Sequence, residues 1–286
     1  MNVVVQVVVP IAAAAILFLL GLSVDISDFR RLAQRPAPLI IGLLARLVLV
    51  PALAVGLCIL REPAPTTALG LLLVAACPLS TPTAALVQVA YGDKTVALTL
   101  TAVTSLASAV TLPLLLDGTA HMLGVQAAVS LPAVGPAAVR VGLVATVPVL
   151  AGMVLRRARP LLAAWVEPRV TPLALVVLIA VVGAAIYTSK ESILPSLAEA
   201  GGLALALNVL ATALAWQLGR LAGLDWRERV SVALAAGLYN FGLAAFVSLS
   251  VFRDTRILLP GIAYGLLMWG SAAVVAAVGR RRHRTT

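Results

Sequence analysis

Long apolar runs separated by short polar turns make up most of this chain. An α-helix needs about 20 apolar residues to cross the hydrocarbon core of a bilayer, because each residue adds about 1.5 Å. Nine runs meet this requirement: Val3–Ser23, Ala37–Leu60, Thr66–Tyr91, Thr95–Leu116, Pro136–Leu155, Val170–Ser189, Ser196–Ala222, Val230–Phe252 and Ile257–Val278. The pattern predicts an all-α polytopic membrane protein with nine transmembrane helices.

The composition agrees with a protein whose surface faces lipid. Hydrophobic residues make up 62% of the chain and charged residues 11%, and the mean hydropathy is +1.08. A soluble domain usually has about a quarter of its residues charged. The net charge of +10 does not indicate a nucleic-acid partner, because the basic residues lie in turns between apolar runs. We therefore expect the lipid bilayer, and no nucleic acid, as the surroundings.

Basic residues are unequally divided between the two sets of alternating turns. One set with the C-terminal tail has fifteen: Arg30, Arg31, Arg35, Lys94, Arg156, Arg157, Arg159, Arg169, Arg220, Arg227, Arg229, Arg280, Arg281, Arg282 and Arg284. The other set has five: Arg61, Arg140, Lys190, Arg253 and Arg256. Because basic turns stay in the cytoplasm, we predict a multi-pass protein of the inner membrane with Met1 outside and Thr286 in the cytoplasm.

Two of the predicted spans contain interruptions. The third holds Pro78 and Pro82, and an undisturbed helix cannot contain both because each removes a backbone hydrogen bond. The eighth is interrupted at 237–242, with the sequence GLYNFG. These spans are five apart and run in opposite directions. Paired interruptions in inverted halves are typical of transporters with a binding site at the midplane.

This symmetry divides the chain into two repeats. The first covers residues 1–116 with four spans, and the second, inverted repeat covers 136–279 with five. An interfacial connection at 117–135 separates them, and a basic tail follows at 280–286.

Other polar features of the spans favour packing over chemistry. A stripe of hydroxyl residues in the fourth span is typical of side chains that bond to their own helix; it consists of Thr101, Thr104, Ser105, Ser108 and Thr111. Gly261 and Gly265 form a GxxxG element that favours close helix packing. The sequence has no motif of a nucleophile with a base, of a phosphate loop or of a metal cluster, so we expect no enzyme activity and no cofactor.

Several sequence patterns in order along the chain resemble the motifs of one known protein family. Residues 18–22 (FLLGL) with Asp28 and Phe29 resemble its opening signature, and residues 78–84 (PLSTPTA) resemble the PGGTASN motif of its first crossing helix. Gly92, Asp93 and Thr101 follow at the family spacing. Residues 229–245 resemble the second crossing helix; the matching positions are Gly237, Asn240, Leu243 and Ala244. Taken together, these patterns resemble the bile acid:sodium symporter family.

The resemblance implies a fold of two inverted five-helix repeats with a panel domain and a core domain. The resemblance further implies that the chain starts at the family's second helix, which agrees with the expected nine spans. The resemblance also implies sodium-coupled uptake of a small organic anion that binds where the two broken helices cross. The residues expected at the substrate are Arg46, Thr81, Thr83, Tyr239 and Asn240.

The positions that hold sodium in the family differ here. A Ser-Asn pair corresponds to Thr83 and Ala84, hydroxyl positions correspond to Ala97 and Thr101, and a glutamate corresponds to Ala235. The two glutamines of the second sodium site correspond to Arg46 and Tyr239. Because alanine side chains offer no oxygen ligand, these replacements predict that sodium coupling is altered or lost.

Arg46 lies near the middle of the second span, where a charge is costly unless it lines a cavity or has a partner. One interpretation is an arginine that bonds backbone carbonyls or reaches the interface. The interpretation that we favour is a fixed cation in the position of the second sodium ion, where its guanidinium binds the carbonyls of the crossing helices and also attracts an anion.

Two other functions fit the sequence. One alternative is a related inverted-repeat permease for another class of substrate, such as an arsenite or auxin-type permease, and another is a membrane receptor or sensor that does not transport. The sequence leaves open the substrate and whether the protein is a monomer or a homodimer.

Overall fold

The structure is a computed structural model that describes residues 11–12, 14–19, 21–22, 36–80, 83–124, 147–188 and 190–283. These residues form helices joined by short turns, without a strand among them. The helices are α3 (Ala37–Leu44), η1 (Ala45–Leu49), α4 (Val50–Arg61), α5 (Pro65–Ala76), α6 (Thr83–Val89), α7 (Lys94–Met122), α9 (Pro160–Thr188), α10 (Lys190–Leu221), α11 (Trp226–Gly237), α12 (Phe241–Phe246), η3 (Val247–Val251), η4 (Thr255–Leu258) and α13 (Leu259–His283). Further helical residues lie within 11–22 and at 147–158.

Among the described residues, four helical segments are long and apolar enough to cross a membrane: Ala37–Arg61, Ala198–Leu221, Trp226–Val251 and Thr255–Gly279. A fifth is present if Lys94–Ser108 and Val110–Thr119, which meet at an angle of 66°, form one bent span. Pro113 explains the bend, because it removes the hydrogen bond to the carbonyl of residue 109. The chain is therefore a multi-pass membrane protein.

Nine spans and an inverted repeat stay predictions. The predicted spans Val3–Ser23 and Pro136–Leu155 lie partly outside the described residues. Elsewhere the helices extend beyond the predicted boundaries. Helix α7 continues to Met122, inside the predicted connection at 117–135, and α13 continues to His283, inside the predicted tail. Helix α9 begins at Pro160, before the predicted start at Val170, because a proline is well tolerated in the first turn of a helix.

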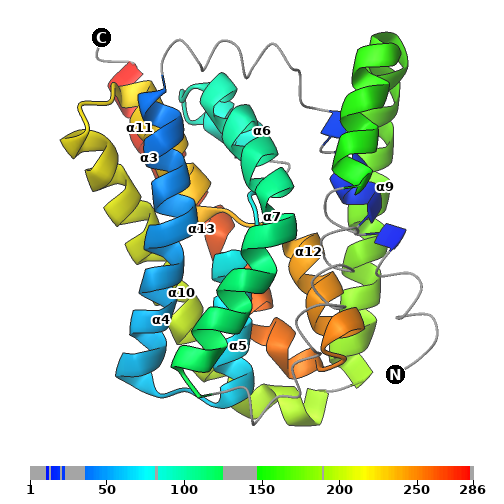
Figure 1. The fold of residues 1–286 in the computed structure, drawn as a ribbon, viewed down its shortest axis with the longest axis vertical. Helices are drawn as coiled ribbons and strands as arrows, with labels where there is room; N and C mark the ends of the chain where they lie inside the picture. Colours follow the sequence, from blue (N-terminus) through cyan, green and yellow to red (C-terminus); the bar gives the residue numbers. More distant parts are fainter. Residues whose placement is uncertain are drawn as a thin grey trace.

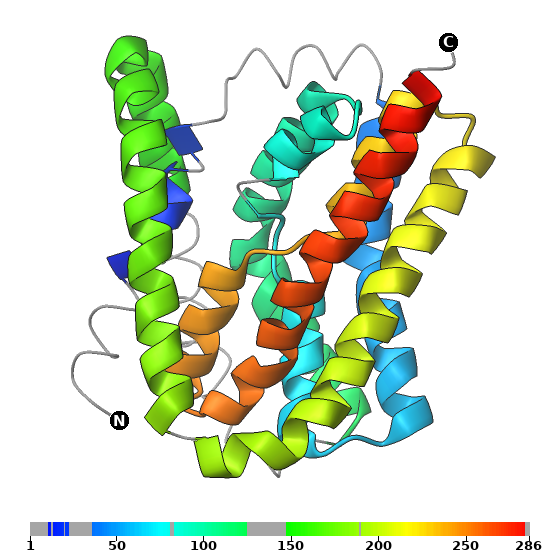
Figure 2. The ribbon, with the colours of Figure 1, turned by 180° about the vertical axis from the view of Figure 1, so that it is seen from behind.

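The helices form two groups in space. Helix α9 and the described helical residues of 11–22 stand at one side of a larger group that contains α3–α7 and α10–α13 (Figure 1). The reverse view in Figure 2 shows the same arrangement. Within the larger group, α10 packs along α11 and α13, and α5 lies against α7 and α13. Most buried apolar side chains belong to one core cluster, which places α5 and α11 in the interior.

Helical residues near the N-terminus approach the 147–158 helix at backbone distance. A Cβ atom on Gly21 would lie 2.1 Å from the carbonyl oxygen of Val149, and one on Gly152 would lie 2.2 Å from that of Phe18. Only glycine fits at both positions, and small residues of this kind allow membrane helices to pack closely.

The described turns of the more basic set gather at one end of the molecule. In Figure 1 the α6–α7 turn, the α10–α11 turn and the start of α9 lie at the same end as the C-terminal end of α13. The α4–α5 turn and η4 lie at the opposite end. At this end, Gly279 of α13 packs closely against the residue that follows α6. A Cβ on Gly279 would lie 2.3 Å from the carbonyl oxygen of Ala90.

Candidate functional site

The first interruption lies between α5 and α6. Helix α5 ends at Ala76, and residues 77–80 are not helical before α6 begins at Thr83. Pro78 explains this end, because the residue before a proline is disfavoured in helical conformation, and Cys77 has an extended backbone here. The predicted break is therefore present. Thr81 and Pro82 lie outside the described residues.

The second interruption lies between α11 and α12. Helix α11 ends at Gly237, Leu238 is extended, and Asn240 caps α12 through a hydrogen bond that its Oδ1 accepts from the N–H of Leu243 at 3.1 Å. A Cβ on Gly237 would lie 2.3 Å from the Oγ1 atom of Thr212 on α10. The glycine thus lets the helix end pack against α10, and this predicted break is also present.

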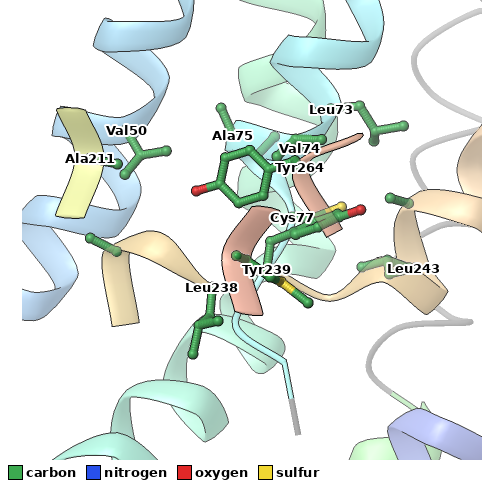
Figure 3. Packing of buried hydrophobic residues seen from close by; sticks show 14 of the residues in the cluster. Val50, Leu73, Val74, Ala75, Cys77, Ala211, Leu238, Tyr239, Leu243 and Tyr264 are labelled. Atoms are coloured by element: carbon green, nitrogen blue, oxygen red, sulfur yellow. The ribbon is translucent and has the colours of Figure 1, made fainter. Parts of the chain in front are cut away.

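The two breaks lie against each other in the interior. The backbone N–H of Asn240 donates a hydrogen bond to the carbonyl oxygen of Pro78 at 2.9 Å. The N–H of Leu79 donates to Oγ1 of Thr104 on α7 at 3.3 Å. Cys77 from the first break and Tyr239 from the second belong to one buried cluster, which Figure 3 shows. Backbone groups freed by the breaks are therefore satisfied across the junction, which we call the crossover (residues 74–80 and 235–240).

Arg46 reaches the crossover from the π-helical turn η1. Pro51 follows in the next turn and lacks an N–H, so the hydrogen bond that it would donate to the carbonyl of residue 47 is missing. A π-helical turn absorbs this disturbance, and Val50 donates instead to the carbonyl of Ala45. The Arg46 side chain is 1% exposed. A charged side chain so deeply buried requires partners.

Backbone carbonyl groups are the partners of Arg46. Its Nε donates to the carbonyl oxygen of Cys77 at 3.1 Å, and Nη2 donates to that of Val74 at 3.0 Å and again to that of Cys77. Its Nη1 donates to the carbonyl oxygen of Ala236 at 3.3 Å. These bonds use four of the five N–H groups of a guanidinium.

The charge of Arg46 is balanced by two helix ends. Val74 and Cys77 lie at the C-terminal end of α5, and Ala236 lies at that of α11. Each helix C-terminus carries roughly half a negative charge, because its last carbonyl groups have no partner within the helix. Within the described part of the chain, no carboxylate forms an ion pair with Arg46. The guanidinium therefore stands where the negative ends of two half-helices converge.

Three further side chains support this arrangement. Asn208 on α10 donates through Nδ2 to the carbonyl oxygen of Gly237 at 2.8 Å, and Tyr239 donates through its hydroxyl to that of Gly261. The rings of Tyr239 and Tyr264 meet edge to face, with centroids 5.3 Å apart, and Figure 3 shows both. We did not predict Asn208 from the sequence, although an amide in an apolar run is a signal that could have identified it.

The positions that correspond to family sodium ligands are placed as follows. Thr83 and Ala84 are buried at the start of α6, and the hydroxyls of Thr83 and Ser80 lie 3.1 Å apart. Ala235 packs in an apolar cluster with Leu79, Val96 and Leu100. Ala97 is buried, and Thr101 donates to the Ala97 carbonyl at 2.7 Å. Arg46 donates to the carbonyl of Ala236, next to Ala235, and lies near Tyr239, whereas the Thr101 hydroxyl is used within α7.

The hydroxyl stripe of α7 behaves largely as predicted. Thr104 donates to the carbonyl of Leu100 at 2.8 Å, and Ser108 donates to that of Ser105 at 2.6 Å. The GxxxG element is also confirmed as a packing element, because a Cβ on Gly261 would lie 3.1 Å from the Tyr239 hydroxyl.

Comparison with known protein sequences identifies the family of this chain. The sequence pattern of the Sodium Bile acid symporter family matches residues 10–196 of this chain. The chain belongs to this family. It is 28% identical over 247 residues to an uncharacterized sodium-dependent transporter, YocS, of Bacillus subtilis, covering 83% of this chain and 72% of that protein. It is also 28% identical over 249 residues to the human ileal sodium/bile acid cotransporter, covering 86% of this chain and 70% of that protein.

A plant relative extends the range of the family. The chain is 23% identical over 262 residues to a probable sodium/metabolite cotransporter, BASS1, of Arabidopsis thaliana chloroplasts, covering 92% of this chain and 64% of that protein. The Sodium Bile acid symporter family consists of transporters and not of enzymes. The chain is therefore a membrane transporter for a small-molecule substrate.

Proposed function

We propose that the chain is a secondary transporter of small organic anions whose substrate binds beside the crossover. The observation that carries this proposal is the direct hydrogen bond between the two breaks, from Asn240 to Pro78. Discontinuous helices that meet within the membrane form the substrate sites of many secondary transporters. Movement of the helices around such a site exposes it alternately to the two sides of the membrane.

An anionic substrate is supported by the chemistry of the crossover and by the relatives. Asn240 is 2% exposed, and its Nδ2 donor has no partner among the described residues. A buried N–H donor of this kind favours a ligand with acceptor oxygens, such as a carboxylate. The human relative is a cotransporter of bile acids, which are organic anions.

Asn240 and the hydroxyl of Thr83 are the substrate contacts that we propose, together with Thr81. Arg46 and Tyr239 border the same region, but backbone carbonyls already accept most of the hydrogen bonds that these two side chains donate. We therefore expect them to shape the site and to affect the substrate through the position of the helix ends.

We also propose that sodium coupling at the family's positions is altered or lost. Ala97 and Ala235 offer no side-chain oxygen, and the hydroxyl of Thr101 is directed to its own helix. Without the carboxylate and amide ligands, transport by facilitated diffusion or exchange fits better than sodium symport.

Uptake by the purified chain in proteoliposomes tests the proposed function. A panel of radiolabelled organic anions, including a bile acid and small carboxylates, is offered with an inward sodium gradient and with potassium in its place. We expect uptake of at least one anion, and loss of it in Asn240→Leu. Thr99→Val serves as the matched control, because the Thr99 hydroxyl only bonds the Thr95 carbonyl of its own helix.

Other outcomes assign other functions. Uptake of arsenite or of auxin-like acids alone would indicate a related permease. Binding of an anion without uptake by correctly reconstituted protein would indicate a receptor or sensor and would overturn the transporter proposal.

For the orientation we propose an inner-membrane protein with its C-terminus in the cytoplasm. The gathering of the basic turns at the C-terminal end of the molecule supports this orientation. A reporter that is active only in the cytoplasm, fused after Thr286, should be active. A silent fusion on correctly inserted protein would reverse the orientation.

A further inference from the structure

We propose that the guanidinium of Arg46 is the resident cation of the crossover and occupies the place of a transported sodium ion. The crossover then keeps a positive charge at every stage of the cycle without binding sodium. The assignment of the cation rests on the geometry of Arg46 alone, and only its consequence for coupling rests on the proposed function.

The geometry of the helix ends requires a cation. Two half-helices, α5 and α11, direct their C-terminal carbonyl groups to one point in the interior. Each end carries a partial negative charge that the apolar surroundings do not screen. In transporters with discontinuous helices, such C-terminal ends and unwound carbonyls coordinate the coupling cation. Here the Nε, Nη1 and Nη2 atoms of Arg46 take these coordinating positions.

The described residues around Arg46 carry no other charge that balances the guanidinium. Its neighbours at the crossover include Cys77, Tyr239 and Tyr264, all buried and none of them a carboxylate. Ala235, next to the Ala236 carbonyl, lies in an apolar cluster. The positive charge of Arg46 and the two negative helix ends therefore form a balanced set, and a sodium ion added beside the guanidinium would be repelled.

A tethered cation differs from sodium in two respects. It cannot leave with the substrate, so the energy of a sodium gradient is not available to the cycle. It also keeps its proton under all physiological conditions, so that the site does not alternate between charged and neutral forms. The crossover therefore always holds a bound cation. We expect transport that is driven by the gradient of the anion alone.

Thermal unfolding of the chain in detergent, without substrate, tests whether Arg46 takes the place of a bound sodium ion. The wild-type protein should unfold at the same temperature in sodium chloride and in choline chloride of equal ionic strength. A rise of the wild-type Tm that is specific to sodium would overturn the inference. This measurement needs no variant.

The second measurement removes the Arg46 side chain and supplies a cation in solution instead. Arg46→Ala should lower Tm by roughly 5 °C or more, and millimolar methylguanidinium chloride should restore part of this loss while leaving the wild type unchanged. If neither methylguanidinium nor sodium raises the Tm of Arg46→Ala, the cation role is wrong. Arg256→Ala is the matched control, because this arginine is 54% exposed and its loss should create no cation dependence.

A comparison of lysine with glutamine separates charge from hydrogen bonding. Arg46→Lys keeps the charge with fewer donors, and Arg46→Gln keeps a donor without the charge. We expect Arg46→Lys to be the more stable of the two, and the reverse order would contradict the inference even if Arg46→Ala does not fold.

The uptake assay distinguishes this inference from the proposed function. If wild-type uptake of an anion depends on the sodium gradient, the resident cation is wrong but the transporter function stands. If no anion is taken up while Tm responds to cations as expected, only the proposed transport of organic anions fails.

Discussion

Arg46 and Arg256 place the same side chain in two different regions of the molecule. Arg256 lies at the start of η4, 54% exposed, and forms an ion pair with Asp254 in which Nη2 and Oδ2 are 2.8 Å apart. Arg46 is 1% exposed and donates to three backbone carbonyls at the crossover. One arginine has a carboxylate partner and the other has helix ends.

The difference shows how the cost of a charge depends on its surroundings. At the exposed turn, water screens the ion pair and the pair contributes little to stability. In the interior, the described residues offer Arg46 no carboxylate, so the helix dipoles and carbonyl groups stabilise the guanidinium. The same bonds satisfy the ends of α5 and α11, and removing the side chain would disturb both half-helices together.

Replacing each arginine by leucine should show the largest contrast. Arg46→Leu leaves the carbonyls of Val74, Cys77 and Ala236 without a donor, and each unsatisfied group costs about 1–3 kcal/mol. We expect a loss of about 3 kcal/mol or more in the free energy of unfolding, measured by SDS titration in mixed micelles. Arg256→Leu should cost below about 1 kcal/mol. Similar losses for the two variants would contradict the role given to the crossover.

A carboxylate introduced beside Arg46 sharpens the comparison, because it gives the buried arginine the kind of partner that Arg256 has. Ala235→Glu alone should pair with Arg46 and create no sodium dependence. In an Arg46→Gln background the same glutamate should restore a sodium site. A sodium concentration of about 100 times Kd should then add about 2.7 kcal/mol of stability.

The control for this pair is Ala235→Gln in the Arg46→Gln background, which supplies an amide of similar size without the charge. Thermal unfolding in sodium and in choline chloride measures all of these variants. Equal sodium stabilisation of Ala235→Glu with and without Arg46 would show that the guanidinium does not occupy the ion's place.

Asn208 provides a neutral counterpart to Arg46 at the end of α11. Asn208→Leu removes the donor to the Gly237 carbonyl, and we expect a loss of about 1–2 kcal/mol, as for other interhelical hydrogen bonds in membranes. Thr212→Val, one turn further along α10, is the control, since the Thr212 hydroxyl has no partner among the described residues. A larger loss from Thr212→Val than from Asn208→Leu in SDS titration would refute this assignment.

The smallest effect is expected at Asp254. Burial acts to raise the pKa of this carboxyl, but hydrogen bonds from Arg256 and its positive charge outweigh burial and hold the pKa below its ordinary value of 3.8. A lowered folded-state pKa adds stability at neutral pH, which is lost as the pH falls through the folded-state value. Asp254→Asn should therefore lower Tm slightly at pH 7, with the difference from wild type vanishing on acidification below about pH 3.8. A difference that grows on acidification would contradict this.

Features set by local chemistry could be predicted from the sequence. Pro78 and Gly237 lie at the ends of their helices for local reasons that do not depend on the rest of the fold. Proline removes a backbone donor, and glycine disfavours a continuous helix because it loses more conformational freedom than other residues. The hydroxyls of Thr101 and Thr104 bond to their own helix because the carbonyls four residues earlier are always within reach. The composition likewise determined that the protein lies in a membrane.

What the tertiary structure alone decided is which groups meet. The carbonyl that accepts from Nη1 of Arg46 lies 190 residues away in the chain, and Asn208 reaches Gly237 only because α10 packs along α11. Arg46 in the sequence indicated a buried charge that needed a partner, but hydropathy is the same whether that partner is a carboxylate, an anion or a helix end. The packing of α5 and α11 against η1 selects the helix ends, because it brings two sets of unpaired carbonyls within hydrogen-bond distance of one guanidinium.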